Sequence, residues 1–161
     1  MINQPHNQST ATNPVGRFMV AVGAVIENID SGKILIIQRA STQDWRGGEW
    51  EIDYGRIDQF EDPIDGLKRE IKEEVGITDL HLKEVIRVWH MYRGPVSAEN
   101  DLIGITYYCQ TQMQNVQLSE EHIAYQWVTP EEALEVIKTE GIREDITRFI
   151  KLKQMNETHF Y

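Results

Sequence analysis

Residues 55–77 read GRIDQFEDPIDGLKREIKEEVGI, and this stretch decides how the chain can be interpreted. It predicts a helix that begins after Asp62, because Asp is a good N-cap and Pro63 is tolerated in the first turn. Gly76 ends the helix, since glycine readily adopts the left-handed conformation there. Between these limits, apolar residues recur at helical spacing and form one stripe. These residues are Ile64, Leu67, Ile71 and Val75.

Three carboxylates lie beside this apolar stripe. At about 100° per residue, Glu70, Glu73 and Glu74 fall within roughly a third of the helix circumference. Clustered carboxylates repel one another unless a cation lies among them, and the hard cation Mg²⁺ prefers oxygen ligands. Gly66 lies on the same side, and we hypothesise that it leaves room for a bulky anion or a metal-bound water. The stretch therefore indicates divalent-metal chemistry on a phosphate.

The same residues resemble the Nudix box, G-x5-E-x7-R-E-U-x-E-E-x-G-U with U apolar, and every fixed position is met. Seven fixed identities match by chance on the order of 10⁻⁹ per window, which disfavours a plain solvated acidic face. The order of the predicted elements extends the resemblance to residues 17–153. It implies an α/β fold, the Nudix-type α/β/α sandwich with a central mixed β-sheet.

The resemblance also implies roles for the box residues. Glu70, Glu73 and Glu74 would bind Mg²⁺, with Mn²⁺ as an alternative, and the Gly55 carbonyl would add a ligand. In the same way, the resemblance gives structural roles to the remaining box positions. Glu61 and Arg69 would brace the loop against the helix, and Gly76 would close the helix.

A fourth carboxylate is expected beyond the box, as a metal ligand or as the base for the attacking water. The segment LSEEHIAYQWVTPEEAL at residues 118–134 resembles the family's segment before its C-terminal helix. Glu121 and Glu120 are both candidates there, and the spacing to Trp127 favours Glu121. Glu131 and Glu132 start a helix instead, because they follow Thr129-Pro130 in a capping box.

One departure from the family pattern affects the substrate more than the catalysis. Many members have Pro-Gly-Gly where the box begins, whereas this chain has Asp53-Tyr54-Gly55. A tyrosine does not adopt the unusual dihedrals of glycine freely, so we expect the loop to follow another path. Asp53 is interpreted as a turn residue or as an extra polar contact or ligand.

Residues that bind the substrate are less well defined by the sequence. Arg39, Arg46 and Arg56 are candidates to grip phosphates, the alternative being exposed solubilising charges. Glu120 remains a candidate contact if Glu121 is the fourth carboxylate. Several aromatic residues could offer a ring face to a nucleobase or could pack in the core. They are Trp45, Trp50, Tyr54, Trp89 and Tyr92.

Composition agrees with one cytoplasmic domain. The 26 acidic and 16 basic residues give a formal charge of −10, which disfavours duplex nucleic acid and anionic membranes as partners. The single cysteine, Cys109, suits a reducing compartment and excludes an intrachain disulfide. No apolar run approaches the length of a membrane span. The five histidines lack ligand spacing, which disfavours zinc.

Together these patterns predict a Mg²⁺-dependent hydrolase that cleaves the pyrophosphate linkage of a small nucleoside diphosphate derivative. A non-catalytic nucleotide-sensing module is the main alternative. An isoprenoid diphosphate isomerase would show a catalytic cysteine in a dedicated motif, which is not seen around Cys109. The resemblance also allows a homodimer.

The remaining elements are predicted from periodicity and turn residues. A disordered arm at residues 1–16 precedes the domain at 17–153, and a tail covers 154–161. Strands are expected at 17–26, 33–38, 51–53, 81–92, 101–111 and 124–128, and further helices at 130–139 and 142–153.

Overall fold

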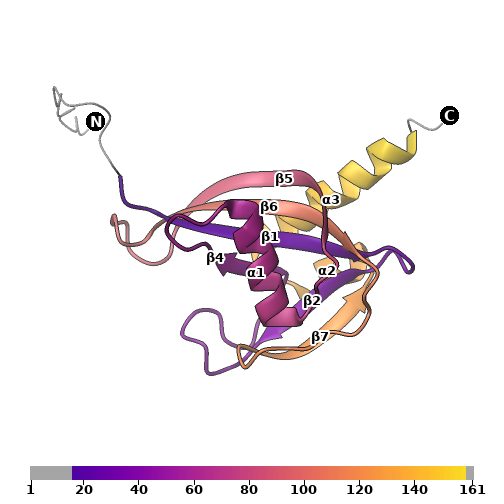
Figure 1. Ribbon diagram of the computed structural model, residues 1–161, viewed down its shortest axis with the longest axis horizontal. Coiled ribbons are helices and arrows are strands. Elements are labelled where there is room, and N and C mark those ends of the chain that lie inside the picture. The colour runs from indigo at the N-terminus through magenta and orange to yellow at the C-terminus, as the bar shows by residue number, and fades with distance from the viewer. Residues whose placement is uncertain (1–15, 159–161) are drawn as a thin grey trace.

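The computed structural model describes residues 16–158. The predicted arm at residues 1–16 lies outside this range except for Gly16, and so do the last three residues of the predicted tail. Ten elements follow one another along the chain (Figure 1). They are β1 (Met19–Asn28), β2 (Ile34–Arg39), β3 (Trp50–Glu51), β4 (Asp53–Arg56), α1 (Pro63–Val75), β5 (His81–Tyr92), β6 (Asp101–Thr111), β7 (His122–Val128), α2 (Pro130–Val136) and α3 (Glu140–Thr158).

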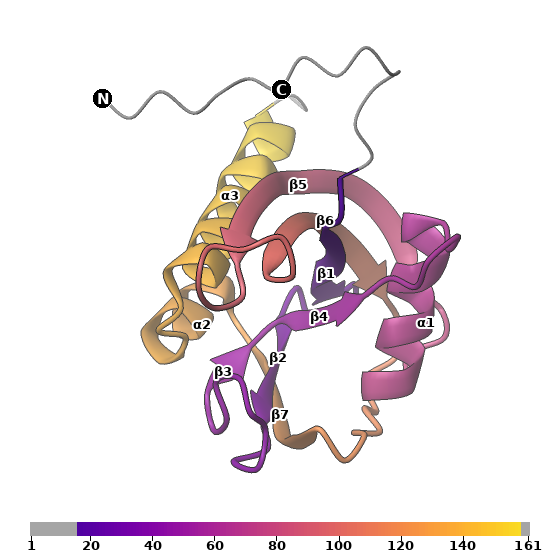
Figure 2. The same ribbon diagram turned by 90° about the vertical axis from the view of Figure 1, so that its left-hand side faces the viewer.

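The strands form one mixed sheet. Its main order is β3-β2-β1-β6-β5, while β4 pairs with β1 and β7 pairs with β2. β1 and β6 are parallel along their whole paired length, whereas the β1–β4, β2–β7 and β5–β6 pairs are antiparallel. Helices lie on both faces, with α1 on one side and α2 and α3 on the other (Figure 2). The expected α/β/α sandwich with a central mixed sheet is confirmed.

Alternation along the strands builds a separate core on each face, because successive strand residues point to opposite sides. In β2, Leu35 and Ile37 pack with α1, while Ile34 and Ile36 pack with α2 and α3. The α1 core contains Val22, Ala24, Ile26, Leu35, Ile37, Leu67, Ile71, Val75, Ile77, Tyr107 and Cys109. The other core contains Val25, Ile34, Ile36, Ile52, Tyr108, Ala133, Ile137, Ile142, Ile146 and Phe149.

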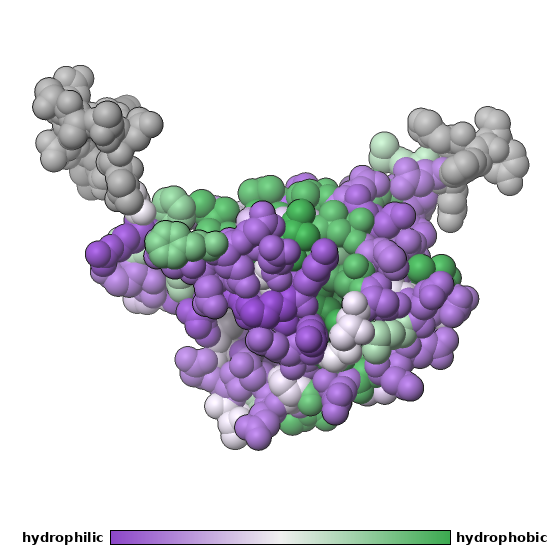
Figure 3. Space-filling model, viewed as in Figure 1, coloured by the Kyte–Doolittle hydropathy of each residue, from purple (hydrophilic) through white to green (hydrophobic). Residues whose placement is uncertain are grey.

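The helix α1 begins and ends where the sequence predicts. The Asp62 carboxylate accepts a hydrogen bond from the Ile64 amide at 2.8 Å, and Gly76 closes the helix with φ 74°. Leu67, Ile71 and Val75 are fully buried beneath the helix. The outward face of α1 is hydrophilic (Figure 3). This amphipathic packing fixes which side chains of α1 face the sheet.

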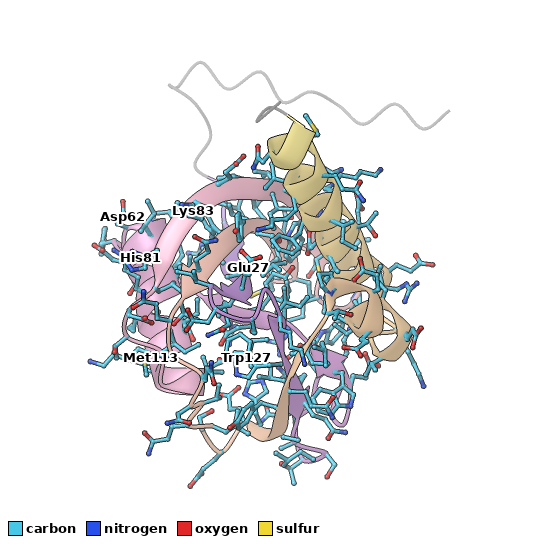
Figure 4. All side chains as sticks on the ribbon, turned by 90° about the vertical axis from the view of Figure 1, so that its right-hand side faces the viewer. Glu27, Asp62, His81, Lys83, Met113 and Trp127 are labelled. Atoms are coloured by element: carbon cyan, nitrogen blue, oxygen red, sulfur yellow. The ribbon has the colours of Figure 1, made fainter. Side chains whose placement is uncertain are left out.

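The C-terminal helix α3 is longer than predicted. It extends the expected 142–153 at both ends, so that residues 154–158 of the predicted tail are helical. Gly141 lies in its first turn instead of separating two helices. Lys153 of α3 contacts the buried Glu27 carboxylate at 2.9 Å, and Glu27 lies between the sheet and this helix (Figure 4). This ion pair ties the C-terminal half of α3 to β1.

The strands at 81–92 and 101–111 have the predicted bounds. The single strand expected at 51–53 is instead two short strands, β3 and β4, which continue one another around Ile52. Tyr54 is extended inside β4, so glycine dihedrals are not needed there. In the described part of the chain, none of the helices is long and apolar enough to cross a lipid bilayer.

Candidate metal and phosphate site

The segment formed by β3 and β4 presents a row of side chains to α1. Ile52 and Tyr54 pack with the core under α2 and α3. Glu51, Asp53 and Gly55 therefore face the opposite side, because the side-chain period of a strand is two residues. Both acidic side chains are buried, with Asp53 only 3% exposed. The surface beneath α1 is thus acidic as well.

Glu70 and Glu74 of α1 stand above this row, one helical turn apart. A Cβ atom on Gly55 would overlap Cγ and Cδ of Glu70, so the absence of a side chain lets the strand and the carboxylate approach. Glu74 is buried, and the charges of Asp53 and Glu121 act on its carboxylate. The helix and the strand therefore bring four acidic residues together, two from each chain segment. These are Glu51 and Asp53 from β3 and β4, and Glu70 and Glu74 from α1.

Arg69 braces the loop before α1 against the helix. Its Nε and Nη2 donate to the two carboxylate oxygens of Glu61 at 2.7 and 2.8 Å, and Nη2 also donates to the Arg56 carbonyl at 3.2 Å. The paired guanidinium lowers the pKa of Glu61 to about 2. These contacts tie the loop before α1 to the helix.

Arg69 also holds the other glutamates of the helix. Its Nη1 donates to Glu70 at 2.9 Å and to Glu73 at 3.3 Å. The Glu73 side chain is 61% exposed, compared with 14% for Glu70. Glu70 therefore faces inward, whereas Glu73 lies at the outer surface of α1.

His122 of β7 connects the acidic row to the helix. Its Nε2 lies 3.2 Å from Glu51 Oε1, and its Nδ1 lies 3.8 Å from Glu74 Oε2. Arg39 donates to the same Glu51 oxygen at 3.0 Å. The spacing of the histidines bears only on zinc, so it does not predict this role of His122. The sequence did contain one indication, because His122 directly follows Glu121, the candidate fourth carboxylate.

The cluster has more negative charge than its hydrogen bonds compensate. Within residues 16–158, neither carboxylate oxygen of Asp53 has a hydrogen-bond partner, and the same holds for Nδ1 of His122. Burial raises the pKa of Asp53 above its ordinary value, and the charges of Glu51, Glu70 and Glu121 raise it further. Burial and the neighbouring Asp53 raise the pKa of Glu74 in the same way. Removing this many charges from water without a cation is unfavourable.

A cleft of about 1830 Å³ opens over the cluster. Glu51, Glu70, Glu74 and Glu121 line its acidic side, and Asp53 lies directly beneath the lining residues. Glu120 and Glu121 both belong to the described range, but only Glu121 of these two lines the cleft. The opposite wall comes from β5, the α2–α3 connection and the 43–49 loop, with Trp45, Arg46, Arg87, Trp89, Arg93 and Lys138 among its residues.

A family model described as the NUDIX domain matches residues 17–150. The chain belongs to the Nudix family. The box at residues 55–77 therefore corresponds in this structure to the end of β4, the braced loop and α1. The row of side chains beneath α1 is the part of the site that lies outside the box.

Curated relatives match at moderate identity. An octanoyltransferase from Myxococcus xanthus is 27% identical over 133 residues, and the match covers 80% of this chain but 35% of that protein. A CTP pyrophosphohydrolase from Escherichia coli K12 is 29% identical over 134 residues, covering 74% of this chain and 82% of the relative. This chain thus spans about a third of the first protein and most of the second.

Solved structures support the fold. The crystal structure of a MutT protein from Methanosarcina mazei Go1 matches with a TM-score of 0.68 at 24% identity, covering 89% of this chain and 99% of that one. At this identity the likeness shows the shared α/β Nudix fold alone.

The candidate substrate residues of this Nudix domain have different environments. Arg39 lines the cleft, but its guanidinium is engaged by Glu51, the Trp45 carbonyl and Gln43. Arg46 also lines the cleft, stacks on Trp45 and donates to Thr139. Trp89 borders the cleft, whereas Trp50 and Tyr92, both described, do not. Sequence reasoning named Trp89 only within a larger aromatic set.

Tyr54 is bound into a polar network that sequence reasoning missed. Its hydroxyl donates to Asp145 of α3 and lies 3.0 Å from Thr106 Oγ1. Arg87 of β5 donates to the other Asp145 oxygen at 2.5 Å and to the Gly141 carbonyl at 2.9 Å. The Tyr54 ring occupies the space above Gly23, where a Cβ would overlap it. The network holds the N-terminal part of α3 against the cleft wall.

The residues present fit a hard divalent cation. Oxygen donors dominate the cluster, and the unpaired buried oxygens of Asp53 indicate a charge that the chain itself does not balance. Within residues 16–158, no three acidic, histidine or cysteine side chains already surround a metal-binding point. Arg69 accounts for part of this, because it holds one oxygen each of Glu70 and Glu73. Metal binding would require Glu70 and Glu73 to exchange their contact with Arg69 for a contact with the ion.

Proposed function

We propose that this chain is a divalent-metal-dependent Nudix pyrophosphohydrolase that acts on a small nucleoside diphosphate derivative. The observation that carries the proposal is the convergence of Glu70, Glu74 and Glu121 on one side of an 1830 Å³ cleft, above a buried carboxylate without a partner. A bound Mg²⁺ or Mn²⁺ would neutralise phosphate charge and lower the pKa of the attacking water. Glu70, Glu73, Glu74, Glu121 and the Gly55 carbonyl are the proposed ligands.

The chain's own residues have separate tasks in this proposal. Glu121 is the proposed fourth carboxylate, which as a base would accept the proton of the attacking water, because it lines the cleft and Glu120 does not. Glu61 and Arg69 keep α1 and its approach loop in a fixed relation. Arg39 supports Glu51 and the 40–49 loop rather than meeting a phosphate directly.

The opposite wall would receive the rest of the substrate. Arg93 offers positive charge there, and the faces of Trp45 and Trp89 that the arginines leave open suit a nucleobase. The cleft is larger than the several hundred Å³ that ligand sites commonly enclose, so it has room for a nucleotide conjugate. A small anionic nucleotide conjugate therefore suits the cleft better than an apolar ligand.

Substitution of Glu74 tests the proposal. We expect Glu74→Gln to lower kcat about a hundredfold or more without loss of the fold, because the buried carboxylate is replaced by a neutral isostere. The measurement is Mg²⁺-dependent phosphate release from nucleoside diphosphate sugars, ADP-ribose, nucleoside triphosphates and dinucleoside polyphosphates. Glu135→Gln, an exposed glutamate of α2, is the matched control. Wild-type turnover by Glu74→Gln would refute the assignment.

A non-catalytic nucleotide-sensing module is the second candidate. The observation in its favour is the outward position of Glu73 and its ion pair with Arg69, which leave the box carboxylates divided. Calorimetry with the same nucleotides separates the two functions: binding without turnover in Mg²⁺ or Mn²⁺ would establish the sensor.

An isomerase that uses Cys109 is disfavoured by the structure. The thiol is fully buried in the α1 core, and burial raises its pKa to about 12. A reducing compartment such as the cytoplasm suits the chain, since its one cysteine is free.

A further inference from the structure

Asp53 is the buried acidic residue that the proposed function leaves without a task. It lies in β4 at a position that many family members fill with proline, and it is 3% exposed. Both carboxylate oxygens lack a hydrogen-bond partner among the described residues. A buried carboxylate in this state is unfavourable in the metal-free protein, so its retention needs a physical reason.

The direction of its side chain is fixed by the strand. Asp53 and Gly55 are two residues apart in β4 and therefore point to the same face, toward α1. Gly55 lies directly against Glu70, as the overlap of a Cβ atom there shows. One strand step of two residues spans about 6.6 Å, and one helical turn from Glu70 to Glu74 spans about 6 Å. The two spacings match, so Asp53 lies beside Glu74 when Gly55 lies beside Glu70.

The charges around Asp53 agree with this placement. The negative charges of Glu51, Glu70 and Glu121 act on Asp53, and the charge of Asp53 acts on Glu74. The arginines at the edges of the cluster are already committed. Arg39 pairs with Glu51, and Arg69 pairs with Glu61 and Glu70. His122 Nδ1 lies 3.8 Å from Glu74 Oε2, but no described side chain forms a hydrogen bond with Asp53, so a cation bound from solution would balance this carboxylate.

We propose that Asp53 is an additional carboxylate ligand of the divalent-cation site, reaching the ion from β4 while Glu74 reaches it from α1. The inference rests on the proposed function for the presence of the metal. It adds a ligand that lies outside the 55–77 box. The ion would bind deep in the site, next to the floor of the cleft, where a hard cation surrounded by carboxylates is well shielded from water.

The test measures Mn²⁺ binding by the full chain, without substrate and without turnover. Asp53→Asn is expected to weaken Mn²⁺ binding at least about tenfold in calorimetry or by electron paramagnetic resonance of free Mn²⁺. Asp65→Asn, an exposed acid in the first turn of α1, is the matched control and should bind within about twofold of the wild type. An effect of Asp53→Asn below tenfold, or a wild type without saturable Mn²⁺ binding, overturns the inference.

Thermal unfolding in EDTA separates ligation from a loss of fold. Asp53→Asn should unfold at the wild-type temperature or higher, because it removes an unpaired buried acid, and Mn²⁺ should raise its melting temperature less than that of the wild type. Asp53→Ser, which is smaller and also uncharged, must show the same loss of Mn²⁺ affinity, and an undiminished affinity would overturn the inference. The rate of hydrolysis tests the proposed function separately. If Mn²⁺ binding depends on Asp53 but no substrate is hydrolysed, the proposed function is wrong and the assignment of Asp53 as a ligand still holds.

Discussion

At Gly55 the sheet approaches α1 so closely that a side chain does not fit. The residue is identified by its place in the box, but the reason for glycine appears only in the structure, where Glu70 occupies the space of a Cβ. Asp53 and His122 show the opposite case. The sequence left Asp53 open between a turn residue and a polar contact or ligand and gave His122 no role, since both depend on neighbours that are distant along the chain.

We expect Gly55→Ala to lower kcat about tenfold to a hundredfold, because the new methyl group displaces the Glu70 carboxylate from the cleft. The rate of Mg²⁺-dependent hydrolysis is the measurement, with the melting temperature as a check of folding. Glu135→Ala, at an exposed position of α2 outside the cleft, is the control. Equal activities of the two variants would contradict this explanation.

The Glu61–Arg69 pair predicts a pH dependence of stability. The pKa of Glu61 falls from 4.5 to about 2 in the folded protein, through the hydrogen bonds from Arg69. Because the pKa of Glu61 is lower in the folded than in the unfolded protein, its ionised carboxylate stabilises the fold at pH values above the unfolded pKa. This stabilisation is lost as the pH falls toward the pKa in the folded protein. The melting temperature of Glu61→Gln should therefore lie below that of the wild type at pH 6, and the difference should shrink by pH 3. A difference that stays constant over this range would count against the brace.

At the scale of elements, α1 is the part that local rules describe best. Its cap, its apolar stripe and its closing glycine all lie within 23 residues, so the sequence could predict its bounds. Gly66 is an exception. We expected it to leave room for an anion, but a Cβ there would meet Ile57 and Glu61, so the space is filled by the braced loop. That hypothesis is wrong, because protein atoms occupy the space.

The corrected role of Gly66 gives a prediction for the helix. Alanine would favour the helix by about 1 kcal/mol, but overpacking against Ile57 typically costs about 1–3 kcal/mol. We therefore expect Gly66→Ala to lower the free energy of unfolding by about 1 kcal/mol in urea denaturation. Gly141→Ala in α3 serves as the comparison, because it has room for the methyl group. A Gly66→Ala variant more stable than the wild type would show that the loop does not press on the helix.

At the scale of the whole molecule, two cores share one sheet, and α3 closes the second. Phe149 of α3 is 1% exposed, and its ring centroid lies 5.0 Å from that of Tyr108 in β6. The same helix carries Asp145, which orders Tyr54 and Arg87 beside the cleft. Packing of α3 therefore supports the cleft wall as well as stability.

Truncation of this aromatic contact should be costly. We expect Phe149→Ala to lower the free energy of unfolding by about 3–5 kcal/mol, as for other buried aromatic residues. Lys151→Ala, an exposed position on the same helix, should change it by less than about 0.5 kcal/mol. Chemical denaturation of both variants makes the comparison, and a loss below about 1 kcal/mol for Phe149→Ala would show that α3 is not part of the cooperative core.

The sequence by itself determined α1, the glutamates it carries and most strand positions, because each depends on spacing within a short segment. Tertiary structure alone decided what faces those glutamates. The α1 packing brings Glu51, Asp53 and Gly55 beneath the helix, and β7 delivers His122 from about seventy residues away in sequence. It also pairs Arg39 with Glu51 and Tyr54 with Asp145, while both candidate substrate contacts line the cleft. Side-chain periodicity fixes the face of each element, but only the packing of distant elements determines which charges meet.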